Sequence, residues 1–598
     1  MQPTMEILAR ISKNSLANKE EVFTKLYRYL LRPDIYHVAY KNLYANKGAA
    51  TKGVNNDTAD GFSEAKIERI IKMLSDETYQ PTPVRRTHIA KKNNPDKKRP
   101  LGIPTFTDKL VQEVLRMVLE AVYEPIFLNV SHGFRPGKGC HTAISSLRNE
   151  FTGVRWFVEG DIKGCFDNID HAVLVGLLNN KVKDARMIKL IYKFLKAGYM
   201  ENWQHHKTYS GTPQGSGASP LLANIYLHEL DKFVMKLKTD FDTAGKKKVN
   251  PEYSRNQGRN HRLSKRIEMA EGAEKAQMIA EYQEKQQQLL KLPYTLQTDK
   301  KLKYIRYADD FIIGVKGSQE DCQWIKGKLT EFIGETLKMQ LSEEKTLITH
   351  SSEHARFLGY DVSVRRCGEI KRGGPHNSKM RTLNNKVELL APLNDNIHKF
   401  IFSRKIAKQN DDGTLFPIHR SYLLQLTDLE IVSVYNAELR GICNYYGMAS
   451  NFNKLSYLAY LMEYSCYKTL ANKHKSKITK VKVMYKDGHG GWGIPYETKT
   501  GKKRMYFAKF ADCKGAVNPT DSVSKAAVMY GFSVNTFENR LKAKICELCG
   551  ANESEHYEIH HVNKLKNLKG KQAWEKMMIA KRRKTLVVCR KCHKEIHK

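Results

Sequence analysis

Two adjacent aspartates, Asp309 and Asp310, stand between two apolar runs in the middle of the chain. Residues 305–307 precede them and residues 311–313 follow, so the pattern predicts two strands joined at an acidic hairpin tip. Two neighbouring carboxylates repel each other strongly when buried, so such a pair is tolerated at a surface turn or beside a cation. A solvated acidic turn is the alternative interpretation if no further acid joins them.

A third acid, Asp161, follows another strand-like run at residues 156–159. Transfer of a nucleotide onto a primer needs two divalent ions, one activating the primer 3′-oxygen and one holding the triphosphate. Carboxylate oxygens suit Mg²⁺, which often binds only one or two protein carboxylates together with substrate phosphates. Asp161 and Asp309 on neighbouring strands, with Asp310 beside them, are therefore predicted to hold two Mg²⁺ ions.

A second group of metal-binding residue types lies near the C-terminus. Two Cys-x-x-Cys pairs occur there, whereas the remaining cysteines are scattered singly, which argues against a disulfide scaffold. Four thiolates in two such pairs are typical of a closed tetrahedral Zn²⁺ site in a small domain. Histidines lie between and after the pairs, and the last two are four residues apart, hence on one helix face. The residues are Cys546, Cys549, Cys589 and Cys592, with His560, His561, His593 and His597.

The chain is strongly basic, with 101 Lys and Arg against 63 Asp and Glu and a formal net charge of +38. Such an excess predicts a polyanionic partner, because each neutralised phosphate releases condensed counterions. A membrane surface is the alternative, but the charge runs through the whole chain rather than along one amphipathic helix. We find no apolar stretch of about 18 residues and no secretory signal. We therefore expect a cytoplasmic protein that binds nucleic acid, with no membrane partner.

Apolar periodicity predicts alternating helices and strands around the three acids, which indicates a mixed α/β region followed by a helical one. Residues 240–300 are polar and rich in Lys, Glu and Gln, so a solvated helical insertion is expected there. A sequence-specific RNA contact is the alternative for that segment. Helical spacing occurs at residues 20–31, 64–74, 107–123 and 427–446, and strand-like patterns at residues 84–90, 156–159, 305–313 and 357–364.

The three acids and the blocks around them resemble the palm motifs of reverse transcriptases. The resemblance covers roughly residues 85–365 and implies a right-hand polymerase with fingers and palm that uses dNTPs. The box Tyr-x-Asp-Asp also favours reverse transcriptases over RNA-templated RNA polymerases, in which Gly-Asp-Asp is usual. In family order, the further blocks are Ser-His-Gly-Phe-Arg-Pro at residues 131–136, Gly-Thr-Pro-Gln-Gly at 211–215, Leu-Ser-Glu-Glu-Lys-Thr at 341–346 and Phe-Leu-Gly-Tyr at 357–360.

This resemblance assigns roles by position around the incoming nucleotide. Phe166 matches the steric gate that rejects ribonucleotides, with an ordinary core aromatic as the alternative. Gln214 lines the nucleotide pocket, and Lys345 contacts nucleotide or primer phosphates. One departure is Gly-Ser-Gly at residues 215–217, where many intron-type enzymes have Gly-Gly. The basic residues that grip the triphosphate are Lys97, Lys98 and Arg99, for which a solvated basic loop is the alternative.

Residues 435–446 resemble the helical thumb, or domain X, of maturases encoded by group II introns. The family comparison implies binding of the parent intron RNA during splicing. On physical grounds the segment is an amphipathic helix with aromatic residues, and most of its apolar side chains are expected in the core. Arg440, Asn444 and Tyr446 are the side chains expected to face RNA.

The C-terminal Cys and His residues resemble an HNH endonuclease, a ββα-metal unit fused to a zinc frame. The resemblance implies that His561 is the general base, while His560, His593 and His597 hold one Mg²⁺ or Mn²⁺ on the scissile phosphate. The middle Asn of the family pattern is absent. Thr585 stands there, and Asn563 or Asn567 could take the role. A purely structural zinc knuckle that binds DNA is the alternative.

Together these features predict a multidomain protein, similar to the lactococcal-type intron proteins, that acts in intron mobility by target-primed reverse transcription. Its expected partners are intron RNA, double-stranded target DNA, dNTPs and a second copy of the chain. A splicing factor with a vestigial polymerase and a reverse transcriptase from a retron or diversity-generating element are the alternatives. The expected domains are an N-terminal basic extension (1–80), reverse transcriptase fingers and palm (81–372), maturase or thumb (373–475), a DNA-binding region (476–540) and an HNH zinc domain (541–598).

Overall fold

The computed structural model describes residues 3–46, 48–91, 94–201, 204–208, 210–211, 217–243, 248–296, 299–366, 369–373, 378–381, 384–488, 491–498, 501–513, 536–554 and 556–598. One hydrophobic core joins the N-terminal helices, one face of a central sheet and a C-terminal module. A second core joins the opposite face of that sheet to the helical region that follows it. None of the described helices combines the length and apolar character needed to cross a membrane.

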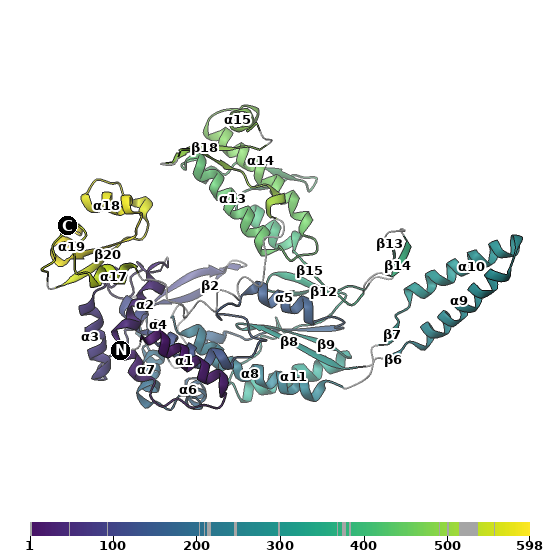
Figure 1. Ribbon diagram of the computed structural model, residues 1–598, viewed down its shortest axis with the longest axis horizontal. Helices are drawn as coiled ribbons and strands as arrows, with labels where there is room; N and C mark the ends of the chain where they lie inside the picture. Colours follow the sequence, from purple (N-terminus) through teal and green to yellow (C-terminus); the bar gives the residue numbers. More distant parts are fainter. Residues whose placement is uncertain are drawn as a thin grey trace.

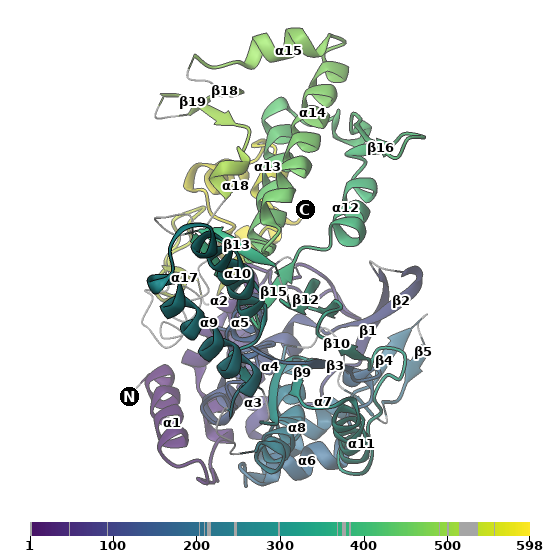
Figure 2. The same ribbon diagram turned by 90° about the vertical axis from the view of Figure 1, so that its right-hand side faces the viewer.

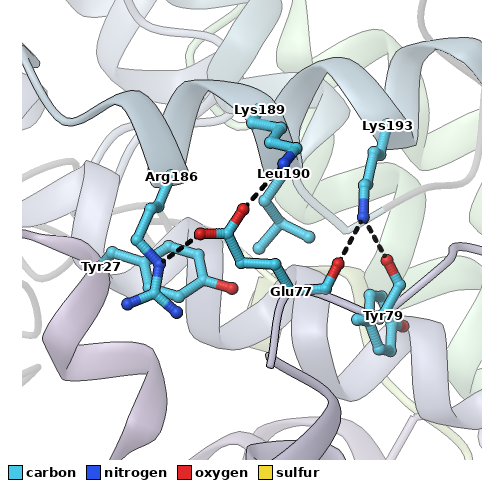
Figure 3. A pocket seen from close by; sticks show the side chains of 7 residues that line it. All are labelled: Tyr27, Glu77, Tyr79, Arg186, Lys189, Leu190 and Lys193. Carbon is cyan, nitrogen blue, oxygen red and sulfur yellow. Dashed lines mark hydrogen bonds and ion pairs between the residues drawn. The ribbon is translucent and has the colours of Figure 1, made fainter. Parts of the chain in front are cut away.

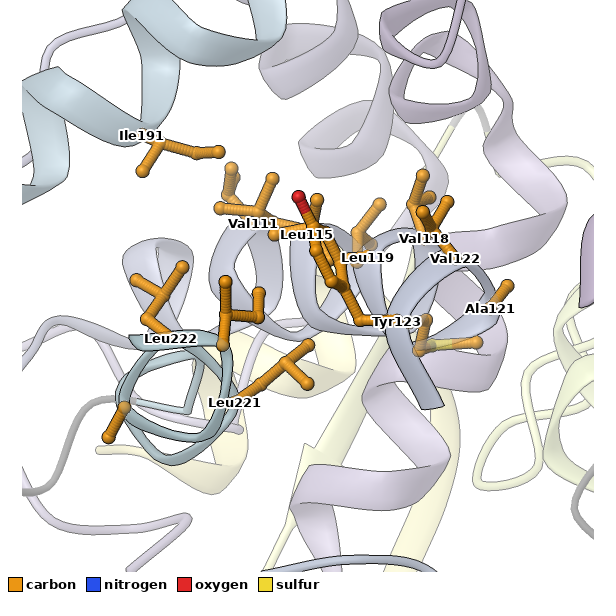
Figure 4. Close-up of a cluster of buried hydrophobic side chains, with 14 of the residues drawn as sticks. Val111, Leu115, Val118, Leu119, Ala121, Val122, Tyr123, Ile191, Leu221 and Leu222 are labelled. Atoms are coloured by element: carbon orange, nitrogen blue, oxygen red, sulfur yellow. The ribbon is translucent and has the colours of Figure 1, made fainter. Parts of the chain in front are cut away.

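Helix α4 (Phe106–Tyr123) is the centre of the first core and confirms the helix expected at residues 107–123. Figure 4 shows its apolar side chains, among them Leu115 and Leu119, beside Leu221 and Leu222 of α8 (Ser219–Phe241). Its N-cap residue Thr105 accepts a hydrogen bond from the Asp108 backbone, which fixes the start of the helix. Helices α1 (Thr4–Ala17) and α2 (Pro33–Tyr44) pack on α4. The same core also contains buried residues of α3 (Glu64–Ser75), α6 (His171–Asn179) and α7 (Ala185–Lys196).

The helix expected at residues 20–31 is wrong over most of its length, because only a short 3-10 helix, η1 (Tyr27–Leu31), forms there. The backbone of Phe23 instead exchanges hydrogen bonds with Lys181 and Lys183 in the loop after α6. Tertiary pairing therefore outweighs the helical spacing of the apolar residues.

Helix α7 is tied to the segment after α3 by charged contacts around a small pocket (Figure 3). Glu77 lies 3.1 Å from Arg186 and 2.8 Å from Lys189, and Lys193 donates to the Glu77 and Tyr79 carbonyls. Because these ion pairs are largely exposed, they contribute little to stability. We interpret the pocket as a structural junction.

The central sheet has the strand order β10-β3-β9-β8, with every neighbouring pair antiparallel. Alternate residues enter opposite cores: Val158 and Ile313 face α8 and α11 (Gln319–Glu335), whereas Phe157 and Ile312 face α5 (Cys140–Glu150). Figure 1 shows α5 on one side of the sheet and α8 with α11 on the other. The strands are β3 (Trp156–Asp161), β8 (Lys301–Tyr307), β9 (Asp310–Lys316) and β10 (Ile348–His350).

A second sheet, β2-β1-β4-β5, carries the basic segment expected to grip the triphosphate. Its hairpin of β1 (Val84–Lys91) and β2 (Asn94–Ile103) confirms the strand expected at residues 84–90. β4 (Tyr199–Glu201) joins β1 in parallel, and β5 (Gln204–His206) closes the edge.

Residues 240–300 contain a long helical hairpin that projects from the body of the molecule (Figure 1). Helices α9 (Pro251–Met269) and α10 (Gly272–Lys291) pack on each other between the short strands β6 (Lys248–Val249) and β7 (Thr295–Leu296). Among their described residues only Asn260, Leu263 and Leu289 are buried. The expected solvated helical insertion is therefore confirmed.

The second core holds the helical region after the sheet, which rises away from it in Figure 2. Helix α13 (Asp428–Tyr445) confirms the helix expected at residues 427–446 and begins with a capping box of Thr427 and Glu430. The other elements are β11 (Ala355–Phe357), β12 (Tyr360–Val364), β13 (Ile370–Gly373), β14 (Ser378–Arg381), β15 (Val387–Leu390), α12 (His398–Ser403), β16 (Ala407–Gln409), β17 (Leu415–Pro417), α14 (Leu455–Lys473), α15 (Ile478–Tyr485), β18 (Gly493–Thr498) and β19 (Gly501–Tyr506).

The C-terminal module, residues 536–598, packs against the N-terminal helices at the left of Figure 1. Its hairpin of β20 and β21 is followed by α19, which gives the ββα order expected from the sequence. Residues 514–535 of the expected DNA-binding region lie outside the described residues. The module contains α17 (Thr536–Lys542), β20 (Tyr557–His561), α18 (Ala573–Lys581), β21 (Thr585–Cys589) and α19 (Arg590–Ile596).

Candidate active sites

The three acids converge at one end of the central sheet. Asp161 at the end of β3 is the direct cross-strand partner of Asp310 at the start of β9. Asp310 also pairs with Tyr307 of β8, so Ala308 and Asp309 form a two-residue turn between the strands. The predicted hairpin tip and its approach to Asp161 are therefore confirmed.

The carboxyl groups at this tip strongly influence one another. Burial is the main cause that raises the pKa of Asp310 to about 7, and the nearby charges of Asp309 and Asp161 add to it. Burial and the Asp161 charge also raise the pKa of Asp309. The Lys345 ammonium lies 2.7 Å from Asp161 Oδ2 and partly balances this negative charge. Crowded oxygen ligands of this kind favour a divalent cation.

A buried ion pair beneath the turn holds the hairpin in place. Arg306 and Asp231 are both fully buried, and the guanidinium binds both carboxylate oxygens, at 2.7 and 2.6 Å. Arg306 Nη1 also donates to the Ala308 carbonyl at 2.8 Å, while Tyr304 donates to Asp231. Sequence reasoning missed this pair. A lone arginine inside the apolar run of β8 was its only signal.

The segment at residues 131–136 packs against the turn formed by Ala308 and Asp309. The backbones of His132 and Arg306 are hydrogen-bonded, and a Cβ added to Gly133 would lie 2.3 Å from the Ala308 nitrogen. Only glycine fits so close to another backbone. Ala308 itself has a φ of 56°, a left-handed conformation that is strained for alanine and is held by these contacts.

The structure describes only some of the side chains expected around the nucleotide. Phe166 is half-buried and lies edge-on to Phe134, with ring centroids 6.0 Å apart. Lys98 and Arg99 are exposed on β2, and Lys345 reaches Asp161. Gln214 and the Lys97 side chain lie outside the described residues.

The four cysteines expected to bind zinc come together in the C-terminal module. Their sulfur atoms all lie within 4.8 Å of one another, in Cys546, Cys549, Cys589 and Cys592. The Cys549 and Cys589 sulfurs are 3.9 Å apart. Zn–S bonds of about 2.3 Å in a tetrahedron place the sulfurs about 3.8 Å apart, so the set fits zinc.

Three of the four expected histidines form a second cluster, joined by an acid from the N-terminal region. Ligand atoms of His560, His593, His597 and Asp60 lie within 4.8 Å of one another. Burial by itself raises the pKa of Asp60, but its close contacts with the His560 and His593 rings lower the pKa well below its usual range. Sequence reasoning missed Asp60, because a contact between the two ends of the chain leaves no local pattern.

His561, the expected general base, points away from this cluster. It is 8% exposed, and its Nε2 atom lies 3.2 Å from the Tyr44 carbonyl of α2. Burial lowers the pKa of His561, which favours the neutral form of its ring. Thr585 Oγ1 instead accepts a hydrogen bond from Arg540, while Asn563 and Asn567 are exposed.

Two of the three side chains expected to face RNA on α13 are exposed, namely Arg440 and Asn444. The expectation for Tyr446 is wrong, because this residue is 4% exposed and its hydroxyl donates to the Gly359 carbonyl. Tyr446 thus packs the helix against the turn between β11 and β12. The sequence of an amphipathic helix does not show by itself whether an aromatic residue packs in the core or faces a ligand.

Three family models match consecutive parts of the chain. Residues 89–244 match the reverse transcriptase (RNA-dependent DNA polymerase) model, and residues 384–543 match the type II intron maturase model. Residues 546–593 match the AI2M/AI1M-like HNH endonuclease model. Asp309 and Asp310 lie beyond the first match, after the helical insertion.

Relatives span the full chain. It is 65% identical to "Group II intron-encoded protein LtrA" of Lactococcus lactis subsp. cremoris over 100% of both chains. It is 35% identical to "Uncharacterized 91 kDa protein in cob intron" of Schizosaccharomyces pombe, over 95% of this chain and 69% of that one. It is 31% identical to "Putative COX1/OXI3 intron 2 protein" of Saccharomyces cerevisiae, over 99% of this chain and 68% of that one. The chain therefore belongs to the family of group II intron-encoded proteins and has reverse transcriptase, intron maturase and HNH endonuclease domains.

Proposed function

We propose that the reverse transcriptase domain copies the parent intron RNA into DNA, with Asp161, Asp309 and Asp310 as ligands of two Mg²⁺ ions. The observation that carries this proposal is the pairing of Asp161 with Asp310 beside the turn that bears Asp309. The ions supply activation of the primer 3′-oxygen and neutralise charge on the triphosphate. In the free protein, Lys345 balances the charge of Asp161, and it is positioned to turn to a nucleotide phosphate.

The nucleotide pocket is proposed to form between the acids and the basic hairpin of β1 and β2. Lys98 and Arg99 are exposed there, and they grip the triphosphate together with Lys97. Phe166 acts as the steric gate, with Gln214 on the other side of the nucleotide. The Gly-Ser-Gly segment at residues 215–217 affects fidelity or nucleotide affinity.

The C-terminal module is proposed to nick one strand of the target DNA and so supply the primer. His561 is the general base for water, and His560, His593 and His597 hold one Mg²⁺ or Mn²⁺. The cysteine cluster binds a structural Zn²⁺, for which its sulfur spacing is suited.

The remaining regions are proposed to bind nucleic acid. Arg440 and Asn444 of α13 contact the parent intron RNA and stabilise the folded ribozyme for splicing. Residues 476–540 contact double-stranded target DNA. The boundaries expected from the sequence (1–80, 81–372, 373–475, 476–540 and 541–598) divide the chain among these tasks. The protein acts in the bacterial cytoplasm and at the nucleoid, and two copies act together as a homodimer.

The division of labour is tested by replacing Asp309 and Asp310 with alanine. The variant is expected to support splicing of the intron RNA in vitro while cDNA synthesis disappears, because RNA binding needs no two-metal site. Glu343→Gln with Glu344→Gln is the matched control, because both acids are exposed in a neighbouring loop. Loss of both activities in a folded protein, or of neither, contradicts the proposal.

A second variant tests the endonuclease. His561→Ala is expected to abolish nicking of the target DNA while extension of a supplied primer stays intact. Unchanged nicking by His561→Ala refutes this assignment of the general base.

A further inference from the structure

The N-terminal region pairs with the C-terminal module through an antiparallel β-bridge between Phe62 and Ile559 of β20. Gly61 donates its backbone hydrogen bond to the Ile559 carbonyl at 3.0 Å, and Ile559 donates to the Phe62 carbonyl at 2.9 Å. Phe62 is fully buried and stacks on Tyr40 of α2, with ring centroids 4.0 Å apart. Main-chain pairing with an exposed strand edge, anchored by a buried side chain, is a specific docking mode. The edge strand it uses is β20, which carries both His560 and His561.

This docking places a carboxylate among the three clustered histidines. Asp60 Oδ1 lies 3.2 Å from His560 Nδ1 and 3.3 Å from His593 Nε2, and Oδ2 lies 2.7 Å from His597 Nε2. His560 is 3% exposed, and neither of its ring nitrogens has a well-formed hydrogen bond within the described chain. A buried imidazole without such partners is explained by a metal ion between these groups. Glu558 accepts a hydrogen bond from His593 Nδ1 and so orients the opposite nitrogen toward Asp60.

We propose that Asp60 is the fourth ligand of a divalent transition metal bound by His560, His593 and His597, and that this ion holds the endonuclease in a closed, non-cleaving state. Three imidazoles and one carboxylate suit ions such as Zn²⁺ or Co²⁺. The inference rests on the proposed endonuclease function of the module. It adds an interdomain ligand and a resting state to that function.

The closed state follows from two features of the docked interface. A catalytic metal site keeps an open position for substrate, whereas four protein ligands close it. Asp60 supplies the anionic oxygen ligand that a scissile phosphate supplies in a working site. His561 is enclosed at the same interface, because its ring faces the Tyr44 carbonyl and its backbone donates to Asp60 Oδ1 at 2.7 Å. Target DNA must therefore displace the N-terminal segment that carries Asp60 before the site can act.

The test uses the full-length protein with zinc already bound at the cysteine cluster, and Co²⁺ as the probe of the second site. Asp60→Asn keeps the shape of the side chain but removes its charge. Glu68→Gln is the matched control, since Glu68 is an exposed acid on the adjacent helix α3. The Co²⁺ affinity of Asp60→Asn is expected to fall by about tenfold or more, as for other losses around a metal site. An affinity equal to that of the control overturns the assignment of Asp60 as a ligand.

Hydrogen exchange at β20 reports the closure without any need for activity. Co²⁺ is expected to slow exchange at the Ile559 and His561 amides in the wild type and in Glu68→Gln but not in Asp60→Asn. If Co²⁺ leaves the exchange rates of these amides unchanged in all three proteins, the proposed interdomain metal site is overturned. If Asp60→Asn does not fold, His597→Ala gives the same two readouts, because this side chain is 54% exposed and its loss leaves the core intact.

Nicking of target DNA by the protein assembled with intron RNA separates the closed state from a productive one. Asp60→Asn is expected to nick faster than the wild type, because its resting state is weakened. A rate at or below that of the wild type overturns the closed state and makes Asp60 a ligand of the working site. If neither the wild type nor the control nicks DNA, the endonuclease function itself fails, while Co²⁺ affinity and hydrogen exchange still decide whether Asp60 binds the metal.

Discussion

Replacing Asp231 with asparagine should both destabilise the reverse transcriptase domain and misplace its acidic turn. Asp231 is the buried counter-ion of Arg306, and no water reaches either side chain. Asparagine preserves the shape of the residue but leaves the arginine charge uncompensated. The same guanidinium holds the Ala308 carbonyl, so its displacement moves Asp309 relative to Asp161.

The expected loss of unfolding free energy follows from the complete burial of the Arg306–Asp231 ion pair. Removing one partner of a buried ion pair costs about 3–5 kcal/mol. For a domain of this size that loss lowers Tm by about 10 °C. A shift of about 1 Å in a reacting group costs about 100-fold in rate, so primer extension should fall by a similar factor even below Tm.

Thermal unfolding and single-turnover primer extension at a temperature where the variant stays folded measure the two effects. Glu229→Gln is the matched control on the same helix, because its ion pair with Lys232 is partly exposed. Such a pair contributes at most about 1 kcal/mol. The reasoning is refuted if Asp231→Asn unfolds within about 2 °C of this control, which corresponds to less than about 1 kcal/mol.

Three further predictions concern the nucleotide, the pH and the zinc. Phe166→Ala should incorporate ribonucleotides more readily than the wild type, measured as the ratio of kcat/KM for dNTP and rNTP; an unchanged ratio would return Phe166 to a packing role. Because burial and neighbouring acids raise the pKa of Asp310 to about 7, protons compete with Mg²⁺ below that pH. The Mg²⁺ concentration for half-maximal extension should rise as pH falls through 7, and a flat profile would argue against Asp310 as a ligand. Cys589→Ser should lose zinc and nicking but keep primer extension, because a structural zinc site stabilises only its own small domain.

Local patterns were sufficient to predict the parts of the fold that depend on them. The apolar runs on both sides of Asp309 and Asp310 required a hairpin, and the pairing of its second strand with β3 brought in Asp161. The Cys-x-x-Cys spacing likewise predicted a cluster that the structure assembles. In each case the residues that meet also carry a recognisable local signal.

Other features depended on contacts between distant segments and could not be predicted. Phe23 pairs with the loop after α6 instead of continuing a helix, and Tyr446 turns into the core. Asp60 has no motif around it, yet backbone pairing with β20 carries it into the histidine cluster. Arg306 and Asp231 likewise belong to no motif, and they meet only because the fold brings distant segments together.

The most direct test is an anomalous-scattering map of the protein with Mn²⁺, a primer–template and a non-hydrolysable dNTP. Two manganese peaks about 4 Å apart are expected, bound by carboxylate oxygens of Asp161 and Asp309 and by the triphosphate. A map with ordered primer and nucleotide but no manganese between these two aspartates would contradict the assignment of the polymerase site.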